Sequence, residues 1–592
     1  MPGHHPSEPR VDRSGGPGWP PEPRRGRLLH RLSLAAAVAA SALPMLALSP
    51  FERLGYDAYW HVFIGGQEQW RVLWEEVHRN AHPPLFYLAL KAAIEAFGAS
   101  PIVYRLVPML ATVGSAWLVG RIVERITRRP WLPAVAAFAF GASLSAVTIG
   151  LDVRSYSLAA MFMLAACLAF LGLADHGFAA PDHPARATFA VAAALALSTH
   201  YVAALFLLGC LVAALAPAAV DRQYRQRLFA AGRRRWAANL ATFAPPFAVL
   251  AAEYLVHIGS WGRLHHVPAF LFDAGREGPL AFVWRNTRAL FDLFAPALDH
   301  RPYASTLVFP GQRLSGAAVA VLAGAALAAV LWLGLRPAGR ERAASPARRV
   351  PPLLLLAMTG LLIALALLGK YPYGGYLRHQ FVLFPFAVIV TALVADEGAL
   401  VAARRFGRSL GALAVGLFAL AVGLNTASWI AQFQVVRTPM MQEQVDRFRE
   451  VFPAAEVIYV DQFNLVNLFM HHDELRWRFV RRIPGGAPVD LWRVGGDGTG
   501  GVSVGFDLCR DQAQWQLDLS QRPTYRRIRR CLDATGAERV TVFRPQQRGK
   551  PIRWRLARTE KLARRLAEST GMVLETLEVG EEGDVYAAFA RR

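Results

Sequence analysis

Long apolar segments alternate with short polar ones along most of the chain. Runs such as Leu32–Leu48, Ala187–Ala216 and Leu353–Leu368 contain almost no charged residue. About 20 apolar residues in a helix are enough to cross the hydrocarbon core of a bilayer. The pattern therefore predicts an α-helical polytopic membrane protein with about eleven transmembrane helices. The predicted spans are Leu32–Ser49 and residues 103–123, 131–150, 153–173, 187–200, 201–217, 236–256, 313–335, 351–369, 379–396 and 411–431.

Basic residues fall between these spans, mostly in short clusters. Cytoplasmic loops of membrane proteins carry such an excess of Lys and Arg. If the chain emerges on the outer side near Pro50, alternation of the spans places every basic cluster on the cytoplasmic side. The segments placed outside are then residues 50–102, 150–153, 257–312, 370–378 and 432–592. The amphipathic stretch His82–Phe97 is short for a span, so we expect an interfacial helix on the outer surface. The basic clusters are Arg24–Arg27, Arg121–Arg129, Arg222–Arg235, Arg336–Arg349 and Arg404–Arg408.

The composition agrees with a membrane location. Of the 592 residues, 54% are hydrophobic and 18% are charged, whereas soluble domains carry about 25% charged residues. In a soluble protein the net charge of +22 would suggest a nucleic-acid partner. Because the charge clusters between spans and the chain carries no RNA- or DNA-binding motif, that function is disfavoured.

The chain divides into three predicted parts. Residues 1–30, rich in Pro, Gly, Arg and His, are expected to be a disordered cytoplasmic tail. Residues 31–431 form the transmembrane module. Residues 432–592 have an ordinary polar composition with short β-rich runs and one helix, Arg553–Glu568, which predicts an extracytoplasmic α/β domain. Cys509 and Cys531 could pair if that domain lies outside the cytosol. The β-rich runs are Glu456–Asp461, Val502–Phe506, Arg539–Phe543 and Val573–Val579.

Ionisable residues are missing from the middles of most spans and collect at their outer ends. Transporters and pumps usually place such groups at the midplane, so this distribution favours a reaction at the outer surface. Each outer residue also has a structural interpretation, as a solvated acid or helix cap, a neutral hydrogen-bonded histidine, a snorkelling arginine or part of an aromatic belt. Four stretches on the outer side carry the candidates: Tyr56 to His61, Asn80 to Tyr87, Leu151 to Tyr156, and Ser198 to Tyr201.

These motifs resemble the bacterial GT-C membrane glycosyltransferases, in the mannosyltransferase-like branch related to protein O-mannosyltransferases and aminoarabinose transferases. The resemblance covers residues 30–220 well and is faint beyond. It departs from the family at Ala58, where Glu usually follows the catalytic Asp, and at Asp152, where Glu usually stands next to the Arg. The matching pieces are Asp57, His82-Pro83-Pro84-Leu85-Phe86-Tyr87, Phe97-Gly98, Arg105, Arg154-Ser155-Tyr156-Ser157-Leu158 and Thr199-His200-Tyr201.

The resemblance implies a polyprenyl-phosphate sugar donor, a cell-envelope glycan, lipid or protein acceptor, and the bacterial inner membrane as location. It makes Asp57 and Asp152 the candidate catalytic residues, with a carboxylate as general base. The leaving lipid phosphate needs cationic or N–H donors, and single displacement would invert the anomeric carbon. Candidates for binding the donor are His82, Arg154, Tyr156, His200, Tyr201, Lys370, Tyr373 and Arg378.

Three points stay open on the sequence. Some GT-C enzymes use Mg²⁺ or Mn²⁺; Asp57, Asp152 and His61 could ligate it, but their spacing does not demand a metal. A lipid-linked glycan flippase or exporter is the alternative function. A third interpretation is an inactive scaffold whose tail binds envelope partners.

Overall fold

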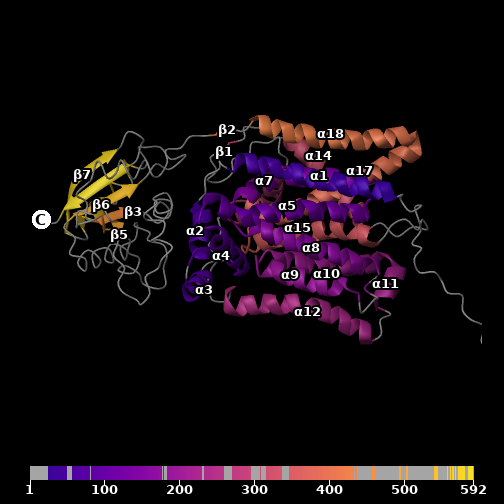
Figure 1. Ribbon diagram of the computed structural model, residues 1–592, viewed down its shortest axis with the longest axis horizontal. Coiled ribbons are helices and arrows are strands. Elements are labelled where there is room, and N and C mark those ends of the chain that lie inside the picture. The colour runs from indigo at the N-terminus through magenta and orange to yellow at the C-terminus, as the bar shows by residue number, and fades with distance from the viewer. Residues whose placement is uncertain are drawn as a thin grey trace, which may run out of the picture.

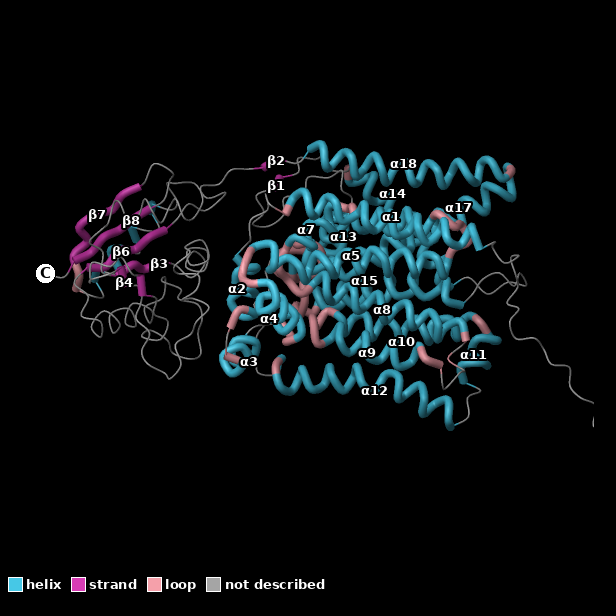
Figure 2. Tube along the Cα trace, viewed as in Figure 1, coloured by secondary structure: helices cyan, strands magenta, loops and turns pink. Residues whose placement is uncertain are grey.

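The computed structural model describes residues 24–49, 56–67, 69–79, 82–176, 178, 183–229, 233–258, 270–294, 307–308, 315–335 and most of 346–432, together with short stretches between 434 and 590. Figure 1 shows most of the helices running lengthwise side by side, with α2, α3 and α4 gathered at one end. Figure 2 shows that the helical part and the strand-rich part of the chain occupy separate regions.

The helices follow the predicted apolar segments. The first half of the bundle contains α1 (Arg24–Leu48), α2 (Tyr56–Gly65), α3 (Trp70–Arg79), α4 (Leu85–Phe97), α5 (Pro101–Ile126), α6 (Leu132–Gly141), α7 (Leu144–Leu151), α8 (Tyr156–Asp175), α9 (Ala185–Leu197) and α10 (Ala203–Val220). The second half contains α11 (Arg222–Phe229), α12 (Arg233–Val256), α13 (Pro279–Phe294), α14 (Gly316–Leu335), α15 (Val350–Leu367), α16 (Leu377–Gln380), α17 (Phe384–Phe406) and α18 (Arg408–Gln432), with 3₁₀ turns at Pro346–Arg349 and Phe381–Leu383.

Eight of the described helices are long and apolar enough to span a membrane, or nine if the bent pair α6–α7 is one span. This confirms a polytopic helical membrane fold. The remaining predicted spans coincide with α9, which has 13 residues, and α18, whose Ala419–Ala431 is a shorter apolar stretch. The total of about eleven spans stays a prediction.

The N-terminal helix begins earlier than the predicted span. Residues 24–30, expected to belong to a disordered tail, are helical in α1. Arginine and leucine favour helix formation, and His30 adds a contact to Glu124 of α5, 3.1 Å from Nε2 to a carboxylate oxygen. The predicted boundary at Leu32 is therefore several residues late.

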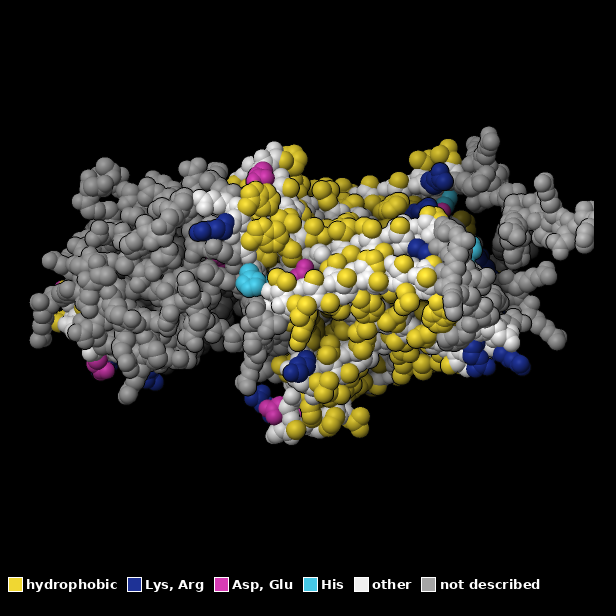
Figure 3. All heavy atoms as spheres, turned by 90° about the horizontal axis from the view of Figure 1, so that it is seen from below, with side chains coloured by type: hydrophobic (Ala, Val, Ile, Leu, Met, Phe, Trp, Pro, Cys, Tyr) yellow, Lys and Arg dark blue, Asp and Glu magenta, His cyan; other side chains and the backbone are white. Residues whose placement is uncertain are grey.

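The centre of the bundle is α8. Of its span, 78% is buried by other helices, whereas only 11% of the α12 span and 22% of the α14 span are buried. The core around α8 is filled by fully buried aromatic side chains such as Phe170, Phe189 and Phe206. The outer surfaces of the peripheral helices expose apolar residues, and Figure 3 shows this apolar surface along the side of the helical body. Such a surface suits contact with lipid chains.

The predicted span 131–150 is not straight. It is divided into α6 and α7, which meet at an angle of 52°. At the break, Ser143 caps α7 by accepting a hydrogen bond from the Ala146 amide at 3.1 Å. The indole of Trp429 in α18 donates to the carbonyl of Ala142 at 3.1 Å. The break is therefore stabilised by side chains that take up backbone groups freed from the helix.

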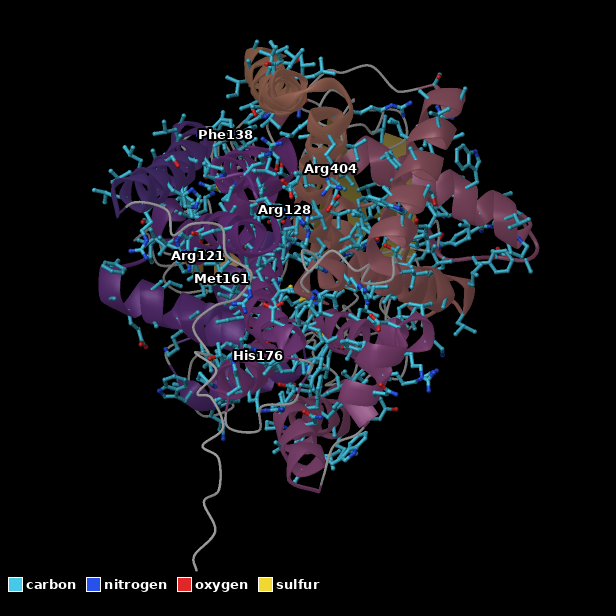
Figure 4. The ribbon with its side chains drawn as sticks, turned by 90° about the vertical axis from the view of Figure 1, so that its right-hand side faces the viewer. Arg121, Arg128, Phe138, Met161, His176 and Arg404 are labelled. Carbon is cyan, nitrogen blue, oxygen red and sulfur yellow. The ribbon has the colours of Figure 1, made fainter. Side chains whose placement is uncertain are left out.

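Predicted cytoplasmic basic clusters meet at one end of the bundle. Arg125 pairs with Asp175 at 2.9 Å, Arg349 with Asp221 at 3.3 Å, and Arg348 with Asp396 at 2.9 Å. These pairs join the end of α5 to that of α8, and join the turn before α15 to the end of α10 and to the middle of α17. Figure 4 looks at the molecule from this end, with Arg121, Arg128 and Arg404 labelled.

The strands lie in two sheets. Leu307–Val308 (β1) pairs antiparallel with Gln434–Val435 (β2). The larger sheet has the order β5-β4-β3-β6-β8-β7, in which only β3 and β6 are parallel among the described pairs. Figure 1 places it beyond the end of the bundle that holds α2 to α4. Its strands are β3 (Val457–Val460), β4 (Arg493–Val494), β5 (Val502–Ser503), β6 (Arg539–Arg544), β7 (Val573–Val579) and β8 (Val585–Ala590).

Described residues between 556 and 568 are helical, in the region of the predicted helix. The strands and this helix agree with the α/β character expected of the tail, and β2, β4 and β8 are strands that the sequence pattern missed. The division of the chain at residue 432 stays a prediction. Cys509 and Cys531 lie outside the described residues, whereas Cys167 and Cys210 are buried free thiols.

Candidate active site

Three histidines from distant parts of the chain meet at the α2–α4 end of the bundle. His61 comes from α2, His82 from the turn before α4, and His200 from the turn between α9 and α10. The ring centroids of His61 and His82 are 5.1 Å apart, and those of His82 and His200 are 5.0 Å apart. The sequence predicted that the stretches carrying these residues lie on one side of the membrane, and the structure brings them into contact.

The chain folds this way locally because Pro83 and Pro84 end the preceding segment and start α4. The Leu85 amide then donates to the carbonyl of Ser198 at 2.9 Å, which joins the start of α4 to the α9–α10 turn. Lys91 of α4 donates to the carbonyl of Gln67 at 2.7 Å, which holds the end of α2 against α4. The predicted interfacial helix is thus packed against its neighbours on its inner side.

Two tyrosines complete this group. Tyr156, the first residue of α8, has its ring centroid 4.7 Å from that of His200. Tyr87 of α4 is fully buried, with its ring centroid 5.4 Å from that of His61. We call His61, His82, Tyr87, Tyr156 and His200 the His/Tyr cluster.

The histidines of the cluster are uncharged at neutral pH. Burial, followed by the charge of Arg378, lowers the pKa of His61 to about 3. Burial, followed by His61 and Arg154, lowers the pKa of His200 to about 3. Burial is also the main cause that lowers the pKa of His82 well below its ordinary value. The cluster therefore offers neutral donors and acceptors rather than imidazolium charges.

Asp152 and Arg154 are paired beside the cluster. Asp152 ends α7, and its carboxylate lies 3.1 Å from Nε of Arg154. Arg154 is buried, and its charge contributes to the lowered pKa of His200. The structure thus brings Arg154 close to the histidines, while Asp152 serves as its counter-ion.

Arg378 lies in α16, directly after the loop that joins α15 to α16. Gly374 and Gly375 have φ values of +75° and +82°, and a Cβ on Gly374 would lie 2.7 Å from the carbonyl oxygen of Asn286 in α13. Gln380 donates to the carbonyls of Pro372 at 3.0 Å and Gly374 at 3.4 Å. These contacts fix the loop so that Arg378 lies near enough to His61 and His82 to lower both pKa values.

Other residues of this loop point to different partners. The hydroxyl of Tyr373 lies 3.0 Å from that of Thr287, so Tyr373 packs against α13. Lys370 is exposed. The structure does not bring either residue into the His/Tyr cluster, and their roles in donor binding stay predictions.

Tyr201 is also engaged outside the cluster. Its hydroxyl is hydrogen-bonded to Nδ1 of His257, and Nε2 of His257 lies 2.9 Å from the carbonyl of Val77. Because a carbonyl only accepts, Nε2 carries the proton and Nδ1 accepts from Tyr201. Tyr201 therefore joins the ends of α3 and α12 to the α9–α10 turn.

Asp57 lies in the first turn of α2, four residues before His61. Residues four apart lie one helical turn from each other. The side chain of Asp57 lies outside the described part of the structure, so its catalytic role stays a prediction.

Arg105 was noted in the sequence only as part of the family resemblance. It is buried, and its guanidinium donates to the carbonyl of Ser49 at 3.0 Å and to that of Leu151 at 3.2 Å. These carbonyls stand at the ends of α1 and α7, just before the segments that carry Asp57 and Asp152. Neither spacing nor hydropathy indicates which carbonyls an arginine will cap, so sequence reasoning missed this function.

Sequence reasoning also gave no binding role to Tyr87 or His61, although His61 was considered as a metal ligand. For Tyr87, the sequence signal was its place in the short motif His82–Tyr87. Within the described residues, no three His, Cys, Asp or Glu side chains are grouped as metal ligands. The Asp57 side chain lies outside those residues, so the suggested Mg²⁺ or Mn²⁺ site stays a prediction.

No protein-family model and no curated protein matches the chain, but solved structures do. The chain is similar to ArnT from Cupriavidus metallidurans in the apo state, with a TM-score of 0.47, 13% identity, and coverage of 94% of this chain and 97% of that one. It is similar to the archaeal oligosaccharyltransferase AglB from Archaeoglobus fulgidus, in complex with an inhibitory peptide and a dolichol-phosphate, with a TM-score of 0.47, 12% identity, and coverage of 96% and 75%.

A third match is the protein O-mannosyltransferase Pmt1-Pmt2 complex from S. cerevisiae bound to the sugar donor, with a TM-score of 0.29, 15% identity, and coverage of 41% and 36%. All three are GT-C glycosyltransferases, the class that the sequence motifs resemble. At such identities and TM-scores these similarities assign no function, so the function of this chain is inferred from its own residues.

Proposed function

We propose that this chain is an integral-membrane glycosyltransferase. It transfers a sugar from a polyprenyl-phosphate-linked donor to a cell-envelope acceptor at the outer face of the bacterial inner membrane. The observation that carries the proposal is the buried, uncharged His/Tyr cluster, flanked by Arg154 and Arg378, at the end of an apolar helix bundle. The donor has matching chemistry, because its polyprenyl chain is apolar, its phosphate is anionic and its sugar carries hydroxyls.

The distribution of basic residues supports this side of the membrane. The basic clusters of α5, α11 and the turn before α15 lie at the opposite end of the bundle from the His/Tyr cluster, and the positive-inside rule assigns that end to the cytoplasm. The cluster and the C-terminal sheet then lie outside. An acceptor in the cell envelope can reach the cluster from that side.

In the proposed reaction, an acceptor hydroxyl attacks the anomeric carbon of the donor sugar. The new bond joins that oxygen to the anomeric carbon, and the bond from the anomeric carbon to the phosphate oxygen breaks. Asp57 takes the proton of the hydroxyl as general base. The lipid phosphate leaves with the bonding electron pair, and a single displacement of this kind inverts the anomeric carbon.

Arg154 and Arg378 stabilise the charge that develops on the leaving phosphate. Guanidinium groups suit this role because they remain charged and donate several hydrogen bonds to phosphate oxygens. Asp152, paired with Arg154 at 3.1 Å, orients that guanidinium. The effect of such donors is large in a site shielded from water, since they are already oriented before the reaction.

Purified full-length protein in lipid nanodiscs, incubated with a panel of polyprenyl-phosphate sugars and envelope extract, tests the proposal. Mass spectrometry should detect an acceptor whose mass is increased by one sugar, together with free polyprenyl phosphate. Asp273→Asn is the control variant, because Asp273 is exposed and pairs with exposed Arg276. Lipid scrambling in liposomes without any transfer would contradict the proposal and support the flippase.

A further inference from the structure

Several buried polar atoms of the His/Tyr cluster make no hydrogen bond within the described chain. They are Nδ1 of His82, the hydroxyl of Tyr87 and Nε2 of His200. Tyr87 is fully buried, and His200 is 5% exposed. Buried polar groups in native proteins are nearly always hydrogen-bonded, so a set of them in contact with one another indicates a place for a polar ligand.

The hydrogen-bonding character of these atoms is mixed. Nδ1 of His200 accepts from the Val202 amide at 3.1 Å, so in the neutral ring Nε2 carries the proton and donates. The Tyr87 hydroxyl both donates and accepts. Sugar hydroxyls also donate and accept, so neighbouring hydroxyls on a sugar ring complement such a set.

Among the described side chains, the charged groups that act on His61 and His200 are Arg378 and Arg154, and both are positive. The charge of Arg378 helps to lower the pKa of His61, and that of Arg154 helps to lower the pKa of His200. Asp152, the acid near the cluster whose side chain is described, is already paired with Arg154. A cationic amino group placed between these histidines and the two arginines would meet the like charges of Arg154 and Arg378 in a buried setting, which is unfavourable.

We propose that His82, Tyr87 and His200 form the subsite for the sugar of the donor, and that this sugar carries hydroxyl groups and no amino group. The inference rests on the proposed function and specifies its substrate class. Arg154 and Arg378 hold the phosphate, whereas the neutral histidines and Tyr87 bind the sugar.

Binding measurements on the full chain in nanodiscs test this assignment without requiring an acceptor. The probes are a polyprenyl-phosphate neutral hexose, the matching polyprenyl-phosphate amino-hexose and polyprenyl phosphate alone. The two sugar lipids carry the same phosphodiester, so their difference reports the sugar. We expect the neutral hexose lipid to bind at least 10-fold more tightly than the amino-hexose lipid, and equal or reversed affinities would overturn the proposal.

Two variants locate the effect. Tyr87→Phe removes one neutral hydrogen bond to the sugar, which should weaken binding of the hexose lipid about 3- to 10-fold and leave polyprenyl phosphate binding unchanged. His200→Leu removes the Nε2 donor and should likewise weaken binding of the hexose lipid while leaving polyprenyl phosphate binding unchanged. Tyr224→Phe is the matched control, because the buried Tyr224 hydroxyl donates to the carbonyl of Ala214 near the other end of α10, at 3.1 Å.

The outcomes separate this inference from the function on which it rests. If both variants weaken polyprenyl phosphate alone as much as the hexose lipid, the cluster binds phosphate and the sugar assignment is wrong. If the two sugar lipids bind equally, only the sugar assignment fails. If none of the three lipids binds, the proposed function fails with it.

Discussion

Replacing Arg105 by methionine should loosen two helix ends at once. The buried guanidinium caps the carbonyls of Ser49 and Leu151 at 3.0 and 3.2 Å. A hydrogen bond from a charged donor contributes about 1.5–3 kcal/mol, so the loss of two predicts destabilisation by about 3–6 kcal/mol. For a folded module of roughly 400 residues, 1 kcal/mol corresponds to about 1 °C. The apparent unfolding temperature should therefore fall by about 3–6 °C.

The same substitution should also slow sugar transfer, because the two capped ends lead into the segments of Asp57 and Asp152. We expect a lower kcat with an unchanged KM for the donor, since Arg105 positions these segments and does not bind the donor. Arg105→Lys keeps the charge and can cap one carbonyl, so it should recover about half of the lost stability.

Arg121→Met is the matched control for this prediction. Arg121 lies on the same helix, is partly exposed and pairs with Glu124 at 2.5 Å. Such a pair contributes at most about 1 kcal/mol. Thermal unfolding followed by tryptophan fluorescence in detergent measures both variants. An Arg105→Met protein that unfolds at the wild-type temperature, or no lower than the control, would refute the reasoning.

Two further predictions concern the loop of Arg378 and the buried histidines. Gly374→Ala should weaken donor binding, because the left-handed backbone costs about 1–2 kcal/mol and the new Cβ would lie 2.7 Å from the Asn286 carbonyl. Gly407→Ala is the control, because Gly407 also has a positive φ of +98° but has nothing within 4 Å of a new Cβ, so its backbone should be strained without any loss of donor binding. Equal donor binding in both variants would show that the loop before Arg378 does not contribute to donor binding. Since the pKa of His200 is about 3 in the folded chain and about 6.5 when unfolded, the unfolded state takes up a proton first as the pH falls. Stability should therefore be complete above pH 6.5 and decline below it toward pH 3, and a His200→Leu variant should show a shallower decline in thermal unfolding between pH 7 and 4.5.

The helical fold could be predicted from the sequence because apolar spans carry a strong local signal. Segment lengths and the basic clusters were enough to place α5, α8, α10 and α15. The break between α6 and α7 could not be predicted, because Ser143 and Trp429 replace the lost helical hydrogen bonds and Trp429 is distant in the sequence. The early part of α1 likewise makes a long-range contact, from His30 to Glu124.

The sequence predicted those residues of the candidate site that belong to short recognisable motifs. His82, Arg154, Tyr156 and His200 were selected from their motifs and lie together in the structure. Tyr201, in contrast, bonds to His257, which lies in a segment without a recognisable motif. Sequence reasoning likewise could not show that burial leaves the three histidines neutral, since burial depends on the packing of α2, α4 and the α9–α10 turn.

The central claim is that Asp57 acts as the base of a glycosyl transfer. The most direct measurement is the rate of sugar transfer by purified Asp57→Asn protein, compared with wild type and with the exposed control Asp273→Asn. Loss of a general base should lower kcat by about 10²- to 10⁴-fold, while donor binding and the unfolding temperature stay close to those of wild type. Transfer by Asp57→Asn at a rate near that of wild type would contradict the account.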